Sequence, residues 1–169
     1  MYYDGVIKAL NKNKIKYAVA GGVAVVLYGY TRLTVDLDLI VELSEKNLDK
    51  FFDTLYNLEY RPKVPVTKEE FKSKQKRKEW IQKKGMVVFS FFNLKDRLKL
   101  IDVFVTEPIK FSEIEKKIEK IKINNLVLNT VCIEHLKKLK LLASRPQDLI
   151  DIRNLEEIQR LKNEQNKNK

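Results

Sequence analysis

The sequence predicts an α/β fold in which a mixed β-sheet is flanked by helices. Short apolar, β-branched runs such as 16–20 and 36–42 alternate with segments of helical spacing such as 44–57. Signals in this order are typical of a sheet covered by helices and not of a helical bundle. Hydrophobic residues make up 44% of the chain, with only 5 Gly and 4 Pro, which excludes a disordered or fibrous protein.

The length and composition narrow the class of protein further. A chain of 169 residues is expected to form one domain, and no apolar run approaches the ~20 residues that span a bilayer. We therefore expect a cytoplasmic protein without a membrane partner. The formal net charge of +11 favours anionic partners such as nucleotides and nucleic acid. Because Cys132 and His135 are the single residues of their types, any metal must be held by carboxylates.

The N-terminal half is predicted to alternate between helices and strands. A turn at Gly21-Gly22 separates the first strand from a mostly apolar helix. Pro62 and Pro65 then break the chain, and the Lys/Arg-rich stretch 68–84 is either a basic surface helix or a mobile loop. The expected helices are 2–13, 23–30 and 44–57, and the expected strands are 16–20 and 36–42.

The C-terminal half is predicted to contain two strand pairs followed by helices. Runs 86–92 and 98–105 are expected to pair through a polar turn, and a hairpin is expected around Asn124-Asn125. Thr130 is expected to cap a helix ending at 143, and Pro146 to start another ending near 161. The predicted organisation is a core (1–130), C-terminal helices that complete a cleft (131–161) and a disordered tail (162–169).

Two aspartates in one strand carry the first chemical signal. Asp36 and Asp38 are two residues apart, so their side chains project from the same face, ~6.6 Å apart. Two such carboxylates repel each other unless a cation lies between them, and hard oxygen ligands favour Mg²⁺ or Mn²⁺. A surface or calcium-type Asp-x-Asp pair is the alternative.

Gly21 and Gly22 carry the second signal. Without Cβ atoms they let backbone N–H groups approach a phosphate at the start of the following helix. Taken alone, a Gly-Gly pair is more often a plain turn.

Taken together, these stretches resemble a known signature. Gly21-Gly22, then Gly29 with Arg32 and Thr34, and finally Asp36-Leu37-Asp38 resemble the nucleotidyltransferase superfamily related to DNA polymerase β. The closest resemblance is to minimal nucleotidyltransferases and the nucleotidyltransferase-like toxins of abortive-infection systems. It implies a nucleotidyltransferase fold over about residues 15–155, with Mg²⁺ or Mn²⁺ bound by three acids. Gly-Gly replaces the more common Gly-Ser, which puts one hydroxyl contact to phosphate in doubt.

The third acid implied by the resemblance is Asp102, inside the apolar run 99–105. An unpaired aspartate in such a strand is destabilising, so this residue needs a partner on physical grounds as well. A salt bridge to Arg32 or Lys99 is the alternative to metal binding. Arg32 and Thr34 precede the acidic strand and are expected to position phosphate, and the alternative for Thr34 is a plain strand residue.

The segment 136–155 adds a second resemblance, to a Lys followed by Arg-Pro-x-Asp-Leu-x-Asp-Ile. Lys140 and Arg145 would hold the triphosphate or the leaving pyrophosphate. Asp148 would orient one of these cations or cap the last helix, and for Asp151 a structural salt bridge is favoured.

The predicted function is therefore metal-dependent transfer of a nucleoside monophosphate from an NTP to a hydroxyl acceptor. RNA or tRNA is the favoured acceptor, with the basic stretch 68–84 as either an RNA contact or a solvated face. Phe71 and Trp80 stack on bases or anchor the core, and His135 is expected at or near the surface. A role as a toxin with an antitoxin partner, a non-catalytic binding module, and transfer to a small molecule or a protein remain alternatives.

Overall fold

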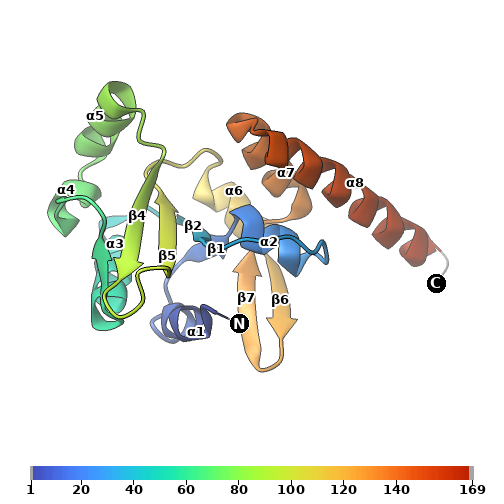
Figure 1. The fold of residues 1–169 in the computed structure, drawn as a ribbon, viewed down its shortest axis with the longest axis horizontal. Helices are drawn as coiled ribbons and strands as arrows, with labels where there is room; N and C mark the ends of the chain where they lie inside the picture. Colours follow the sequence, from blue (N-terminus) through green and yellow to red (C-terminus); the bar gives the residue numbers. More distant parts are fainter. Residues whose placement is uncertain (1, 168–169) are drawn as a thin grey trace.

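The computed structural model describes residues 2–167, which form a seven-stranded sheet with helices around it (Figure 1). The helices of this part of the chain are α1 (Asp4–Lys12), α2 (Gly21–Leu27), α3 (Glu45–Asn57), α4 (Lys68–Lys72), α5 (Lys74–Lys84), α6 (Phe111–Lys116), α7 (Ile133–Ala143) and α8 (Pro146–Lys167). The strands are β1 (Tyr17–Val19), β2 (Leu37–Val41), β3 (Tyr60–Pro62), β4 (Val88–Asn93), β5 (Leu100–Phe104), β6 (Glu119–Ile123) and β7 (Leu126–Thr130).

The sheet is mixed, as predicted, with the strand order β3-β4-β5-β2-β1-β7-β6. β2 runs parallel to β5 and β1 runs parallel to β7, whereas the other neighbouring strands are antiparallel. The parallel pairs arise because chain segments with helices connect β2 to β5 and β1 to β7, and a tight turn cannot join parallel strands. β2 and β5 therefore lie side by side at the centre although sixty residues separate them.

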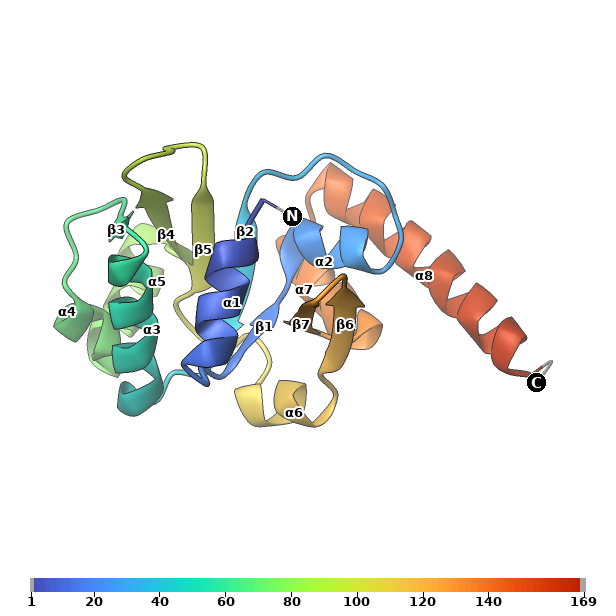
Figure 2. The ribbon, with the colours of Figure 1, turned by 90° about the horizontal axis from the view of Figure 1, so that it is seen from below.

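The two faces of the central strands differ in burial. In β4 and β5 every second residue is fully buried, including Phe89, Phe91 and Val103, and the residues between them are only half-buried. Phe51 and Phe52 of α3 pack edge-on against Phe91, so α3 covers the buried face. Figure 2 shows α1 and α3 on the near side of the sheet. The opposite face of β4 and β5 is left accessible.

Several helix boundaries correct the sequence prediction. α2 already begins at Gly21 and not after a Gly-Gly turn. Thr130 does not cap a helix, because it is the buried last residue of β7, and Cys132 precedes α7. Pro62, interpreted as a break, ends the edge strand β3, where a missing N–H is tolerated.

The C-terminal tail and the basic stretch also differ from expectation. α8 continues to Lys167, since no Gly or Pro interrupts it, so 162–167 are helical where disorder was predicted; 168–169 lie outside the described residues. The stretch 68–84 is two capped helices and not a mobile loop. Phe71 and Trp80 are buried and form ring contacts with Phe89, which confirms the interpretation as core anchors.

No helix in residues 2–167 is both long enough and apolar enough to cross a membrane.

Candidate functional site

The sheet register brings two of the predicted acids together. Asp38 of β2 and Asp102 of β5 are direct partners in the parallel pair, one strand spacing (~4.8 Å) apart. Their side chains therefore project from the same, accessible face, and both are half-buried. Asp36 lies in the bend just before β2. The three acids implied by the sequence resemblance thus lie near one another.

Burial and neighbouring acids disfavour the charged forms of Asp38 and Asp36. Burial, followed by the negative charges of Asp102 and Asp36, raises the pKa of Asp38 from 3.8 to about 6. Burial and the charge of Asp102 also raise the pKa of Asp36, while Lys63 acts in the opposite direction. The sign of both shifts is the one expected for acids gathered without a cation.

The salt-bridge alternative for Asp102 is wrong. Arg32 pairs with Asp151 (Nη1–Oδ2 2.5 Å) and the Lys99 ammonium lies nearest Asp96 (3.8 Å). Among residues 2–167, Asp102 takes part in no salt bridge. Its negative charge is therefore left for another cation to neutralise.

Gly21 and Gly22 are required by close packing and are not a plain turn. Gly21 has φ +59°, and a Cβ there would lie only 1.8 Å from Asp38 Oδ2. A Cβ at Gly22 would lie 2.4 Å from Thr34 Oγ1 and 3.3 Å from Arg32 Cζ. The glycines thus let the start of α2 pack directly onto Asp38 and onto the loop that precedes β2. Whether they also bind phosphate stays a prediction.

The predicted C-terminal residues form one ion-pair network. The buried Lys140 ammonium lies 2.6 Å from Asp151 Oδ2 and 3.2 Å from Asp148 Oδ1. Arg145 Nε lies 2.8 Å from Asp148 Oδ2, and its backbone N–H donates to the same carboxylate, so Asp148 both orients two cations and caps α8. Asp151 also holds Arg32. The network ties α7, α8 and the loop before β2 together.

A cavity of about 460 Å³ joins the acids to these cations. Its lining includes the charged residues Asp38, Asp102, Lys140 and Arg145 and the apolar residues Phe104 and three leucines of α7. Its lining residues are Gly21, Asp38, Val87, Val88, Asp102, Phe104, Pro108, Leu136, Leu139, Lys140, Leu142, Ala143, Arg145 and Asp148. Asp36 is not in this set, so it borders the cavity from outside.

The donor set fits a divalent cation, although the acids are not arranged as a finished cage. Within residues 2–167 no three His, Cys, Asp or Glu side chains converge closely enough to coordinate an ion by themselves. Asp38 and Asp102 are nevertheless neighbours whose charges repel, and neither makes a salt bridge among residues 2–167, although Lys140 offsets part of the effect on Asp38. A hard cation bound between them would reduce this repulsion. Such an ion would take its remaining ligands from phosphate oxygens or water.

Two further side chains on this face escaped the sequence analysis. Ser90 of β4 is in register with Asp102, and Lys63, just after β3, follows in the same row. No local motif contains them, and only the pairing of β3, β4 and β5 places them near the acids.

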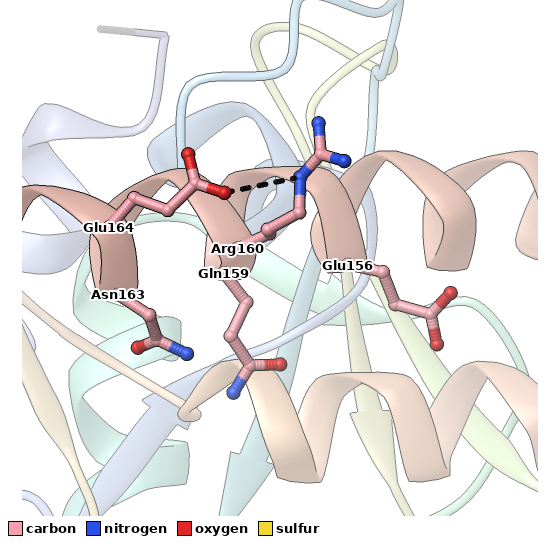
Figure 3. A pocket seen from close by; sticks show the side chains of 5 residues that line it. All are labelled: Glu156, Gln159, Arg160, Asn163 and Glu164. Carbon is pink, nitrogen blue, oxygen red and sulfur yellow. Dashed lines mark ion pairs between the residues drawn. The ribbon is translucent and has the colours of Figure 1, made fainter.

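Other candidates lie apart from this site. His135 was expected to be at the surface or half-buried, but it is buried, and its Nδ1 has no hydrogen-bond partner among residues 2–167. Burial lowers its pKa. Figure 3 shows a second hollow along α8, where the polar side chains of Glu156, Gln159, Arg160, Asn163 and Glu164 stand on one helix. Arg160 pairs with Glu164 at 3.9 Å on the same helix, and Glu156 pairs with Lys137 of α7 at 3.3 Å. It resembles an ordinary solvated helix face.

Solved structures with the same architecture include three proteins, two of which are described as transferases. The lincosamide antibiotic adenylyltransferase LnuA, with lincomycin bound, superposes with a TM-score of 0.58 at 15% identity, over 90% of this chain and 93% of that one. ANT(2'')-Ia in complex with adenylyl-2''-tobramycin gives 0.58 at 14% identity, over 95% and 91%. A putative nucleotidyltransferase from Thermotoga maritima gives 0.55 at 12% identity, over 88% and 86%.

The chain has a nucleotidyltransferase fold. At identities this low the likeness concerns the fold, and it confirms the predicted mixed sheet with flanking helices. Protein-family models and curated proteins give no match to the sequence. In this nucleotidyltransferase fold the paired strands β2 and β5 position Asp38 and Asp102 at the cavity.

Proposed function

We propose that the protein is a metal-dependent nucleotidyltransferase that moves a nucleoside monophosphate from an NTP to a hydroxyl acceptor. The observation that carries the proposal is the pairing of Asp38 with Asp102 beside Gly21, at a cavity that Lys140 and Arg145 also line. The fold shared with adenylyl- and nucleotidyltransferases supports the same reaction class.

Each group has a defined part in this reaction. Asp36, Asp38 and Asp102 would hold Mg²⁺ or Mn²⁺, which supplies neutralisation of the phosphate charge and acidification of the acceptor hydroxyl. Gly21 and Gly22 would let the triphosphate approach the backbone, with Arg32 and Thr34 beside them. Arg145 would bind the departing phosphates, oriented by Asp148. The acceptor hydroxyl oxygen would bond to the α-phosphorus as the bond from that phosphorus to the bridging oxygen breaks. Pyrophosphate would leave with the electron pair of the broken bond, and the hydroxyl proton would pass to water.

RNA is the proposed acceptor. The net charge is +11, and α5 carries five exposed lysines that make no ion pair among residues 2–167. These lysines are Lys74, Lys76, Lys78, Lys83 and Lys84. The connection 85–87 joins α5 to β4, and Val87 of this connection and Val88 of β4 line the cavity. An RNA bound to α5 would therefore lie next to the cavity that contains the acids. The motif resemblance further supports transfer to tRNA by a toxin that an antitoxin protein neutralises.

A small hydroxylated molecule is the second candidate acceptor. The apolar residues that line the cavity and the antibiotic-modifying proteins of the same fold favour it. A non-catalytic binding module is disfavoured because all three acids are present.

Labelled nucleotides separate these functions. NTPs labelled at the α- or the γ-phosphate would be incubated with Mg²⁺ and either total RNA or lincomycin. The proposal predicts that the RNA fraction becomes labelled when the NTP carries the label at the α-phosphate. With the label at the γ-phosphate the RNA product should carry no label, because the γ-phosphate leaves in pyrophosphate. Label in lincomycin alone would favour the second candidate, and γ-label in any product would reject nucleotidyl transfer.

A further inference from the structure

A single row of residues crosses four strands on the accessible face of the sheet. Asp38 pairs with Asp102, and Asp102 pairs with Ser90. Pro62 pairs with Phe91, and the next residue, Lys63, donates its backbone N–H to Ser90 O at 2.9 Å. Residues opposite one another in a sheet project from the same face. Lys63, Ser90, Asp102 and Asp38 therefore share one face, in that order from the edge inward.

Lys63 differs from Lys68 and Lys72 of α4 and from Lys95 because its ammonium makes no salt bridge among residues 2–167. Lys68, Lys72 and Lys95 each lie within 3.5 Å of a carboxylate. Lys63 is exposed and makes no salt bridge among residues 2–167, and its backbone bond to Ser90 places it in the same row as Asp102. Its ammonium is thus a free cation beside the acids.

The row has two chemically different ends. At the inner end, Ala20 N–H donates to Asp38 O (2.9 Å), and Gly21, Lys140 and Arg145 gather around Asp38. This end matches the NTP phosphates. At the other end Lys63 stands at the open edge, two strand spacings or ~10 Å from Asp102. A flexible lysine side chain covers much of that distance.

We propose that Lys63 and the accessible face of β3 and β4 form the acceptor subsite, in which Lys63 binds a phosphate next to the reacting hydroxyl. The acceptor is then an RNA end, whose phosphodiester lies close to its terminal hydroxyl, and not a neutral or cationic small molecule. The inference rests on the proposed function for the identity of the inner end.

Binding of a short single-stranded RNA with a free 3′ hydroxyl tests the subsite without requiring turnover. Fluorescence anisotropy would compare the wild type with Lys63→Gln, Lys63→Arg and the matched control Lys122→Gln. Lys122 is an exposed lysine of β6, the strand at the opposite edge of the sheet. We expect K63Q to lose about tenfold in RNA affinity, the effect of one charge-assisted contact. The slope of log affinity against log salt should be smaller by about one in K63Q than in the wild type. K63R and K122Q should bind RNA nearly as well as the wild type.

Steady-state transfer provides the second readout. K63Q should raise KM for the RNA about tenfold while KM for the NTP stays unchanged. Equal RNA binding by K63Q and the wild type, or equal losses in K63Q and K122Q, would overturn the subsite even if the wild type transfers nucleotides. Absence of transfer by the wild type, together with the predicted loss of RNA binding in K63Q, would reject the proposed function and retain Lys63 as an RNA contact.

Discussion

Asp38 shows how burial and charge act on one residue. Its carboxylate packs against Gly21 at a distance that only a glycine allows, and it faces Asp102 across one strand spacing. Both effects disfavour the charged form and raise its pKa to about 6. A bound cation would offset the unfavourable free energy of the charged Asp38 carboxylate.

Replacing Asp38 by Asn should abolish transfer and stabilise the metal-free protein. Removing a charge that burial and Asp102 disfavour should raise the free energy of unfolding at pH 7.5 by about 1 to 2 kcal/mol. The control is Asp96→Asn, because hydrogen bonds from Tyr2 lower the pKa of Asp96 and its charge is favourable. D96N should keep transfer and lose stability. Chemical denaturation and α-label transfer measure both; a destabilised but active D38N would contradict the metal-site assignment.

The raised pKa of Asp38 also predicts a pH dependence. Between its unfolded value of 3.8 and its folded value of about 6, the folded protein binds the extra proton, so this group stabilises the fold at low pH and the contribution is lost as pH rises through 6. Transfer should show the opposite trend and fall below pH 6, because a protonated carboxyl does not ligate the ion. Higher Mg²⁺ should move the inflection of kcat/KM to lower pH. An inflection unaffected by Mg²⁺ would assign it to another group.

At the scale of elements, the buried network joins α7, α8 and the loop before β2. Lys140 is fixed between Asp148 and Asp151, whereas the side chain of Arg145 is 75% exposed. The sequence resemblance treats these two cations alike, but their surroundings separate them. Lys140 neutralises two buried acids, Asp148 and Asp151. Arg145 is held by Asp148, but its exposed side chain can also contact a ligand.

Lys140→Ala and Arg145→Ala should therefore have different consequences. K140A removes the buried ammonium that two buried carboxylates share, although Asp148 keeps Arg145 and Asp151 keeps Arg32, and it should cost about 3 to 5 kcal/mol of stability. R145A should cost less than about 1 kcal/mol but raise KM for the NTP. Thermal denaturation and steady-state kinetics distinguish the two effects. Equal loss of stability in both variants would show that Arg145 belongs to the packing network alone.

The two basic helices should also differ. In α4, Lys68 and Lys72 pair with Asp49, whereas the α5 lysines are unpaired among residues 2–167. Changing four α5 lysines to Gln should flatten the salt dependence of RNA binding by about one unit for each lost phosphate contact, without altering NTP affinity. A control with four exposed lysines changed elsewhere, K8Q/K12Q/K120Q/K122Q, has the same net charge. Identical slopes in both variants would make α5 an ordinary solvated face.

At the scale of the whole molecule, local patterns were enough for some features and not for others. The alternation of helices and strands along the chain and the hairpin at Asn124 are encoded within a few residues, so they could be predicted. The order of the strands within the sheet depends on long-range pairing and was not predicted. β3, ending in Pro62, could not, because a three-residue edge strand exists only through its pairing with β4. Lys63 and Ser90 were missed for the same reason. The extent of α8 was missed because polar residues signal both disorder and exposed helix.

The proposed nucleotidyl transfer depends most on a divalent ion bound between Asp38 and Asp102. Electron paramagnetic resonance of Mn²⁺, titrated with the wild type, D38N and D102N in the presence of a non-hydrolysable NTP analogue, measures this directly. We predict that the wild type immobilises Mn²⁺ and that each substitution weakens the binding at least tenfold while the folded fraction is unchanged. Equal Mn²⁺ binding by all three proteins, or none by the wild type at millimolar metal, would contradict the account.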